Sequence, residues 1–152
     1  MSEHLFVPKE FKAAYPYNET GVPDFNTETP FPDPWVAITA MAAVTETLRF
    51  SVAVYILPLH DPLEVAKQTS TVAALSGGRL ALGIGTGWMK EEFDVQGIAF
   101  EARGRRMNEQ IDVLRKLWAG KPVAHEGEFF SFPEISMCPA APADIPIWVG
   151  GS

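Results

Sequence analysis

The sequence contains almost no cysteine and no long apolar run. Cys138 is its one cysteine, so a single chain can form neither a disulfide nor a cysteine-based metal site, and we interpret this thiol as inert. The run VAVYILPL contains a proline and falls far short of the roughly 20 apolar residues that cross a membrane. The start, MSEHLFVPKE, lacks the basic and apolar regions of a signal peptide. These absences predict a soluble, cytoplasmic protein without a membrane partner.

Basic clusters are also missing. The net charge is −7, from 12 basic and 19 acidic residues, and the lysines and arginines do not gather as phosphate binding requires. A nucleic-acid partner is therefore not expected. The composition, 47% apolar and 20% charged, is that of a globular protein, and 152 residues suit a single domain, 1–152.

Proline dominates the first part of the chain. Residues 8–32 contain five prolines and no helical periodicity, which predicts a long loop. Four aromatic residues favour a packed loop over a disordered one: Tyr15, Tyr17, Phe25 and Phe31. Such a loop is typical of a lid or a binding loop, and we expect it on the active-site side.

Two Asp-Pro pairs mark helix starts, because aspartate caps free N–H groups and proline fits the first turn. Asp33-Pro34 predicts a helix that ends near 46–47, and Asp61-Pro62 predicts one that ends at Gly77-Gly78. Residues 48–57 and 79–85 between and after them are predicted strands.

Further elements follow the same alternation. We predict a helix over about 103–119, a β-hairpin over 122–132 and a strand over 146–149. The order predicts an α/β fold with a parallel sheet. Three strands cannot close a barrel, and both ends of the chain resemble cuts through a larger fold.

The spacing Gly83-x-Gly85-x-Gly87 at the end of a predicted strand suggests a ligand site, since α/β folds bind ligands at these strand ends. It differs from the G-x-G-x-x-G of dinucleotide-binding folds, and no helix opens directly on it. A dinucleotide site is the weaker interpretation.

Several ordered segments resemble the luciferase-like monooxygenase superfamily, most closely the branch that uses the deazaflavin coenzyme F420. They are SEHLFVP, TPFPDPWVAITAMAAVT, LRFSVAVYILPLHDPLEVAKQTSTVAALSGGRLALGIGTGW, EEFDVQGIAFEARGRRMNEQIDVLRKLW and PIWVGG. The resemblance implies a partial TIM (β/α)8 barrel, from the end of the second strand at residues 2–4 through the fifth strand in PIWVGG, with the hairpin as an insertion.

The resemblance also implies a site. His4, at the tip of the second strand, would lie beside the flavin or deazaflavin ring as a base or polar anchor. A non-prolyl cis peptide at Ala53-Val54 would support the ring. Thr86 and Gly87 would contact the cofactor, with the Thr86 hydroxyl donating to a ring heteroatom. Gly150 and Gly151 would offer backbone N–H groups to its phosphate.

Other polar residues receive structural interpretations. Trp88 replaces a glutamate acid of F420-dependent sugar-phosphate dehydrogenases, which weakens the expectation of their proton-donor chemistry. Glu91 and Glu92 are interpreted as solvated or as complementing a helix dipole. His60 and His125 are interpreted as structural, Arg106 as part of a solvated face, and no motif predicts a metal site.

The implied function is hydride transfer between coenzyme F420 and a small organic substrate held under the 8–32 loop. Two alternatives stay open: an FMN-dependent monooxygenase, and a non-catalytic truncated half-barrel. Whether the chain forms a homodimer is also open.

Overall fold

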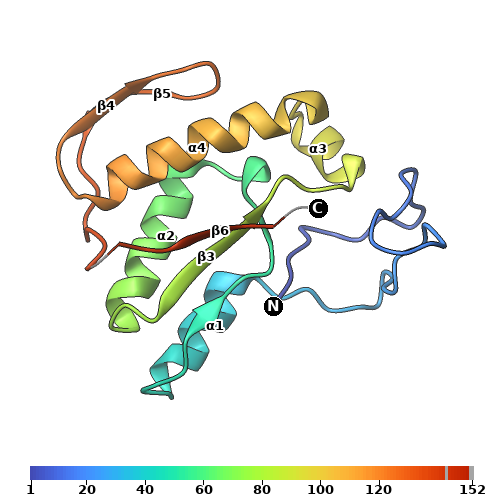
Figure 1. Cartoon of the computed structure of the whole chain (residues 1–152), viewed down its shortest axis with the longest axis horizontal. Helices are drawn as coiled ribbons and strands as arrows, with labels where there is room; N and C mark the ends of the chain where they lie inside the picture. The colour runs from blue at the N-terminus through green and yellow to red at the C-terminus, as the bar shows by residue number, and fades with distance from the viewer. Residues whose placement is uncertain (143, 151–152) are drawn as a thin grey trace.

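A parallel sheet forms the centre of the computed structural model, which describes residues 1–142 and 144–150. Strand β3 (Leu80–Gly85) lies between β6 (Ile147–Val149) on one side and two short strands, β1 (Phe50–Ser51) and β2 (Tyr55–Ile56), on the other. All three pairings with β3 are parallel. Figure 1 shows that the strands point toward the side of the molecule where both chain ends lie. The α/β architecture expected from the sequence is confirmed.

Helices α1 (Pro34–Ala43), α2 (Pro62–Leu75) and α4 (Arg103–Trp118) pack in a row beside the sheet (Figure 1). The predicted caps are present: a carboxylate oxygen of Asp33 accepts from the N–H of Val36, and one of Asp61 accepts from the N–H of Leu63. Helix α1 ends at Ala43, three to four residues earlier than predicted. The guanidinium of Arg79 donates to the carbonyl oxygens of Ala42 and Thr45 and so satisfies groups that a longer helix would have used.

The sequence did not reveal three short helices. These are α3 (Lys90–Gln96) and the 3-10 helices η1 (Leu57–Leu59) and η2 (Phe100–Ala102). Helix α3 has no side-chain cap at Met89 and spans only seven residues, so it carries little periodicity to recognise. It ends at Gly97, whose φ of 68° is the left-handed conformation common at helix ends.

The strand predicted over 48–57 is interrupted. Phe50 is paired with Leu80 and Tyr55 with Ile84, so five steps along β1 and β2 match four along β3. The extra residue makes a bulge between the two strands, and the Ala53–Val54 peptide bond within it is cis. The bulge lies beside the carboxyl half of β3, where it can shape a site.

The hairpin expected over 122–132 consists of the antiparallel strands β4 (Val123–Glu126) and β5 (Ser131–Ile135). It runs three residues further than predicted. Glu109 of α4 holds its turn, because its carboxylate accepts from the N–H groups of Phe129 and Phe130 at 3.0 Å each.

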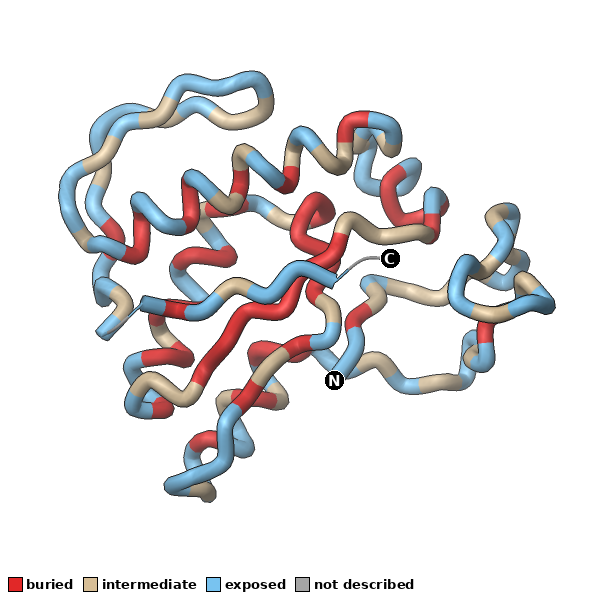
Figure 2. The backbone as a smooth tube through the Cα atoms, viewed as in Figure 1, coloured by how far each residue is buried: buried red, intermediate tan, exposed pale blue. Residues whose placement is uncertain are grey.

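The core lies between the sheet and the helix row. Every residue of β3 is buried, whereas β6 is largely exposed (Figure 2). Residues 1–4 form no assigned strand, although the carbonyl oxygen of Met1 accepts from the N–H of Ala53 at 2.7 Å beside β1. The position of each strand in a complete barrel stays a prediction. Among the described residues, no helix has the length and apolar character needed to cross a membrane.

Candidate functional site

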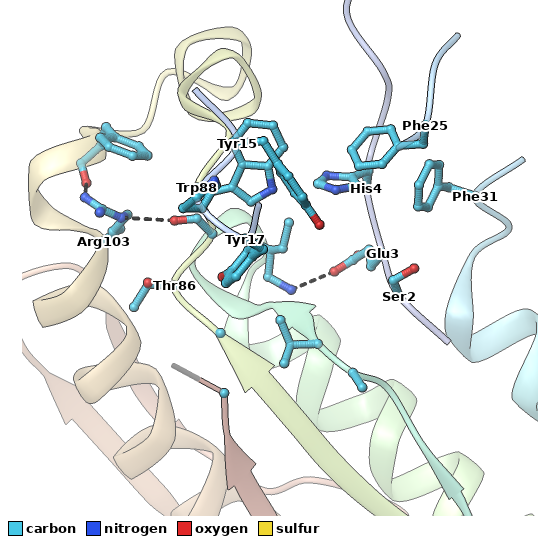
Figure 3. Close-up of a pocket in the computed structure, with 18 of the residues that line it drawn as sticks. Ser2, Glu3, His4, Tyr15, Tyr17, Phe25, Phe31, Thr86, Trp88 and Arg103 are labelled. Carbon is cyan, nitrogen blue, oxygen red and sulfur yellow. Dashed lines mark hydrogen bonds between the residues drawn. The ribbon is translucent and has the colours of Figure 1, made fainter. Parts of the chain in front are cut away.

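A cavity of about 730 Å³ opens at the carboxyl ends of the strands. Its floor comes from the strand ends and the bulge, and its wall comes from residues 2–4, the 8–32 loop and the segment after β3 (Figure 3). Residues 8–32 contain no helix or strand. Four loop aromatics singled out from the sequence line the cavity: Tyr15, Tyr17, Phe25 and Phe31.

All but one of the sequence-predicted site residues meet in this cavity. Its lining includes His4, Ala53, Val54, Thr86, Gly87 and Gly150. These residues come from segments far apart in the sequence. Gly151 lies outside the described residues, so its predicted role stays a prediction.

The glycines of β3 make room for the bulged strand. A methyl group built on Gly85 would lie 2.7 Å from Cγ2 of Val54, and one on Gly150 would lie 2.6 Å from Cγ1 of the same valine. The Val54 side chain therefore sits between two bare Cα atoms. A methyl group on Gly83 would collide with the carbonyl oxygen of Val52. The Gly-x-Gly spacing thus reflects strand packing at this bulge.

Gly87 and Gly150 have different structural roles at the cavity. Gly87 has a φ of 79°, which strongly favours glycine, and its segment turns the chain out of β3 into the cavity wall. The N–H of Gly150 donates to the carbonyl oxygen of Ile84 at 2.7 Å. The expectation that this N–H binds a phosphate is therefore wrong for this structure, because the ladder between β3 and β6 already uses it.

His4 lies among aromatic rings. Its imidazole centroid is 5.0 Å from that of Phe25, 5.1 Å from that of Phe31 and 6.1 Å from that of Trp88. Figure 3 shows the His4 ring between the loop aromatics and Trp88. This packing holds the ring at the cavity wall.

Trp88 joins the loop to the sheet. Its indole stacks on the ring of Phe11 at a centroid distance of 5.9 Å and meets Tyr15 edge-on at 5.1 Å. Aromatic pairs of this geometry add about 0.5–1.5 kcal/mol beyond their buried area. Trp88 therefore holds the 8–32 loop over the cavity.

The interpretation of Glu91 and Glu92 as solvated residues is wrong. Both are buried at the start of α3, and Glu92 is fully inaccessible. Glu92 accepts from the N–H of Leu5 at 2.7 Å and lies 3.2 Å from Nδ1 of His4. Glu91 accepts from the N–H of Lys12. The sequence carried no signal of this burial, because the partners lie about 80 residues earlier in the chain.

Sequence reasoning also missed Arg103. This residue lines the cavity, and its guanidinium lies 3.8 Å from the centroid of the Phe100 ring. It donates to the carbonyl oxygens of Phe100 at 2.9 Å and Gly87 at 3.2 Å. The sequence feature that could have indicated Arg103 is its position at the start of the helix that follows the glycine-rich segment.

Arg106 is not part of a solvated face. Its Nε donates to the carbonyl oxygen of Pro58 at 2.9 Å, and its guanidinium lies over the Phe130 ring. Burial lowers the pKa of this guanidinium against the opposing charges of Asp61 and Glu109. Arg106 thus links η1 to the hairpin.

Glu3, which lines the cavity, also supports the bulge. Its Oε2 accepts from the N–H of Ile56 at 2.8 Å, and its Oε1 lies 2.8 Å from Nε2 of His60. The His60 ring stacks on Tyr55 at 4.2 Å. Burial raises the pKa of the Tyr55 hydroxyl, and the charge of Glu3 raises it further. Tyr55 therefore stays neutral as a packing residue.

His125 also has a carboxylate neighbour. Its Nε2, on hairpin strand β4, lies 3.0 Å from Oε1 of Glu109 on helix α4. Neither His60 nor His125 lines the cavity. In the part of the chain that the structure describes, no three histidine, cysteine or acidic side chains gather as metal ligands would.

Comparisons with known proteins give relatives over nearly the whole chain. An uncharacterized protein of Mycobacterium tuberculosis is 40% identical over 149 residues, which cover 98% of this chain and 52% of that protein. The oxygenase component of a flavin-dependent trigonelline monooxygenase from Acinetobacter baylyi is 30% identical over 122 residues, covering 78% of this chain and 34% of its own. The chain spans about half the length of the first relative.

Solved structures share the fold. The monooxygenase RslO1 from Streptomyces bottropensis superposes with a TM-score of 0.77 at 27% identity, over 97% of this chain and 40% of its own. An F420-dependent secondary alcohol dehydrogenase superposes with a TM-score of 0.74 at 22% identity, over 84% of this chain and 40% of its own. The sequence model of the family described as luciferase-like monooxygenase matches residues 11–152. Since that match takes in the sheet, the helix row and most of the cavity lining, the chain belongs to the luciferase-like monooxygenase family.

Proposed function

We propose that this chain forms the cofactor face of a luciferase-like oxidoreductase that transfers hydride between the deazaflavin coenzyme F420 and a small organic substrate. The observation that carries the proposal is the gathering of His4, the Ala53–Val54 bulge and Thr86 around one cavity. Strand ends of this kind are the usual ligand sites of parallel α/β folds.

The residues present fit a flat ring system. Ligand pockets commonly measure about 300–1,000 Å³, and the cavity of about 730 Å³ falls in that range. The bare Cα atoms of Gly85 and Gly150 allow Val54 to lie flat across the floor. A planar ring could rest on that floor without meeting a side chain from either glycine.

The chain supplies binding and orientation, while the bound cofactor would supply a carbon that accepts and donates hydride. Val54 and Ala53 would support one face of the ring, and the Thr86 hydroxyl would donate to its edge. Arg103 offers a positive charge at the cavity wall for an anionic group of the cofactor. His4 would hold or move the proton that accompanies hydride transfer.

The loop aromatics support an apolar, uncharged substrate. Phe25, Phe31 and Tyr15 cover the side of the cavity opposite the strand ends (Figure 3). Closing such a wall over a substrate excludes water, which strengthens the electrostatic interactions inside. Substrates with a small apolar body and one polar reacting group fit this wall best.

An FMN-dependent monooxygenase is the second candidate. It is favoured by the flavin-dependent trigonelline monooxygenase among the relatives, whereas the F420-dependent alcohol dehydrogenase supports the first candidate. Trp88 weakens the first candidate, because it stands where F420-dependent sugar-phosphate dehydrogenases carry an acid.

The cofactor that the protein retains through purification distinguishes the F420-dependent candidate from the FMN-dependent one. The protein would be produced in a host that makes both F420 and FMN, denatured, and its released cofactor identified by absorption spectrum and mass. Released F420 is expected. Released FMN, with its two-peaked flavin spectrum, would replace the first candidate by the second.

A non-catalytic half-barrel is the third candidate, because the chain spans about half the length of the Mycobacterium tuberculosis relative. Under this reading the folded chain retains neither cofactor, and the same extraction returns no chromophore from folded protein.

A further inference from the structure

His4 and Glu92 form a buried pair whose geometry selects one tautomer of the histidine. Oε2 of Glu92 lies 3.2 Å from Nδ1 of His4, and Oε1 accepts from the N–H of Leu5 at 2.7 Å. The exposed fraction of the side chain is 8% for His4 and 0% for Glu92. Solvent therefore hardly competes with either interaction.

The two contacts of the Glu92 carboxylate, with the N–H of Leu5 and with Nδ1 of His4, determine which atom donates in each. The N–H of Leu5 can only donate, so it occupies Oε1 of Glu92 as an acceptor. An ionised carboxylate has only acceptors, so Oε2 requires a hydrogen on Nδ1 of His4. In the neutral imidazole the second nitrogen, Nε2, then carries a lone pair.

Nε2 is the nitrogen available to a ligand. No described residue forms a hydrogen bond with it, and His4 lines the cavity. The aromatic rings of Phe25 and Phe31 pack against the imidazole at about 5 Å, and the ring of Trp88 lies 6.1 Å away, which opposes a ring flip that would exchange the nitrogens.

We propose that Glu92 is the positioning residue of His4: it fixes the Nδ1–H tautomer and thereby presents Nε2 to the cavity as a proton acceptor. The pair joins the start of the chain to helix α3, so the same contact sets both the protonation pattern and the position of the ring. Its relevance to catalysis rests on the proposed function, whereas the tautomer itself does not.

Replacement by glutamine predicts an inversion, not merely a loss. In Glu92→Gln the side chain has one acceptor oxygen and one donor amide group. The fixed N–H of Leu5 takes the oxygen, so the amide nitrogen faces Nδ1 of His4 and donates to it. The histidine is then expected to carry its proton on Nε2, and the cavity to face a donor.

The test is nitrogen-15 NMR of the imidazole rings in the full chain without cofactor, at a pH where the rings are neutral. The chain has three histidines, and His4→Gln identifies the signals of His4. We expect a protonated Nδ1 and a lone-pair Nε2 in the original chain, and the reverse pattern in Glu92→Gln. Glu91→Gln is the matched control, because Glu91 contacts Lys12 and not His4, and it should leave the pattern unchanged.

The original chain alone can overturn the proposal, even if Glu92→Gln fails to fold. A proton on Nε2 or an equal mixture of tautomers there would refute it, as would an unchanged pattern in folded Glu92→Gln. A chain with the expected tautomer that binds no flavin or deazaflavin would uphold Glu92 and refute the proposed function. A chain that binds a cofactor but carries the proton on Nε2 of His4 would uphold the proposed function and refute the role of Glu92.

Discussion

Val54 is the residue that best explains the shape of the cavity floor. Its two methyl groups occupy the space that side chains at Gly85 and Gly150 would fill. The three residues belong to three different strands or their ends, so this single contact ties the bulge to β3 and β6. Substitutions at either glycine should act through Val54.

Gly85→Ala should destabilise the chain by about 1–3 kcal/mol, because the added methyl group overpacks a buried strand. Val54→Ala removes the obstructing methyl groups, so the double variant should be more stable than the sum of the single effects predicts. Urea unfolding measures the free energy of unfolding of the single variants and of the double variant.

Gly104→Ala is the control for this pair. No atom lies within 4 Å of its added methyl group, so within helix α4 it should be neutral or stabilising by up to about 1 kcal/mol. A Gly85→Ala variant as stable as Gly104→Ala would contradict the packing argument.

Arg103 should matter for cofactor affinity. Arg103→Gln removes the positive charge from the cavity wall, and the loss of a hydrogen bond between charged groups commonly costs about 1.5–3 kcal/mol, or roughly tenfold or more in the dissociation constant. Isothermal titration with cofactor measures the change.

Arg105→Gln is the matched control, since Arg105 pairs with Glu128 at 2.9 Å on the exposed surface and does not line the cavity. Equal affinities of the two variants would show that Arg103 takes no part in binding.

At the scale of elements, Glu109 connects helix α4 to the hairpin. Burial raises the pKa of its carboxyl, but the hydrogen bonds from His125, Phe129 and Phe130 outweigh burial and hold the pKa below its usual value. A carboxyl group with a lowered pKa in the folded state stabilises the fold above its unfolded pKa of about 4.3. That stabilisation is lost as the pH falls through the folded value.

The hairpin turn should therefore open in acid before the core unfolds. Amide hydrogen exchange of Phe129 and Phe130 is expected to accelerate below about pH 4, relative to amides of β3. Glu109→Gln should show fast exchange already at neutral pH, whereas the exposed Glu126→Gln should not. Unchanged protection in Glu109→Gln would mean that the carboxylate does not hold the turn.

Sequence patterns predicted the long elements and missed the short ones. Asp33 and Asp61 marked two helix starts correctly because local hydrogen bonds determine a cap. Helix α3 and the break between β1 and β2 escaped, since neither has periodicity long enough to recognise. The cis peptide at Ala53–Val54 was expected from the family resemblance alone, and the residues themselves indicated only a buried strand.

The site was predictable only where family motifs supplied it. His4, Thr86, Gly87 and Gly150 do line one cavity, although no local rule brings residue 4 near residue 86. Glu92 and Arg103 were missed because their roles depend on contacts across the fold, to Leu5 in one case and to Gly87 in the other.

At the scale of the whole molecule, β6 lies at one edge of the described sheet and pairs there only with β3. Trp148 and Val149 are 60% and 62% exposed, which is unusual for apolar residues on a sheet edge. Such an edge is expected to pair with another strand, so the isolated chain should self-associate.

Sedimentation velocity over a range of concentrations measures this association. Val149→Lys should shift the chain toward monomer, because a charged edge resists pairing. Val95→Lys, at another exposed valine on α3, should leave the distribution unchanged. A chain that is monomeric at every concentration would show that the β6 edge does not drive association.

Equilibrium titration of the folded chain measures whether the cavity binds a flavin-type cofactor. The tryptophan fluorescence of the chain, to which Trp88 in the cavity lining contributes, would be followed during separate additions of F420 and FMN. We expect saturable one-site quenching by at least one of them, with a lower dissociation constant for F420 than for FMN and weaker binding in Arg103→Gln. Folded chain that binds neither cofactor more tightly than about 1 mM, an affinity of only about −4 kcal/mol, would contradict it.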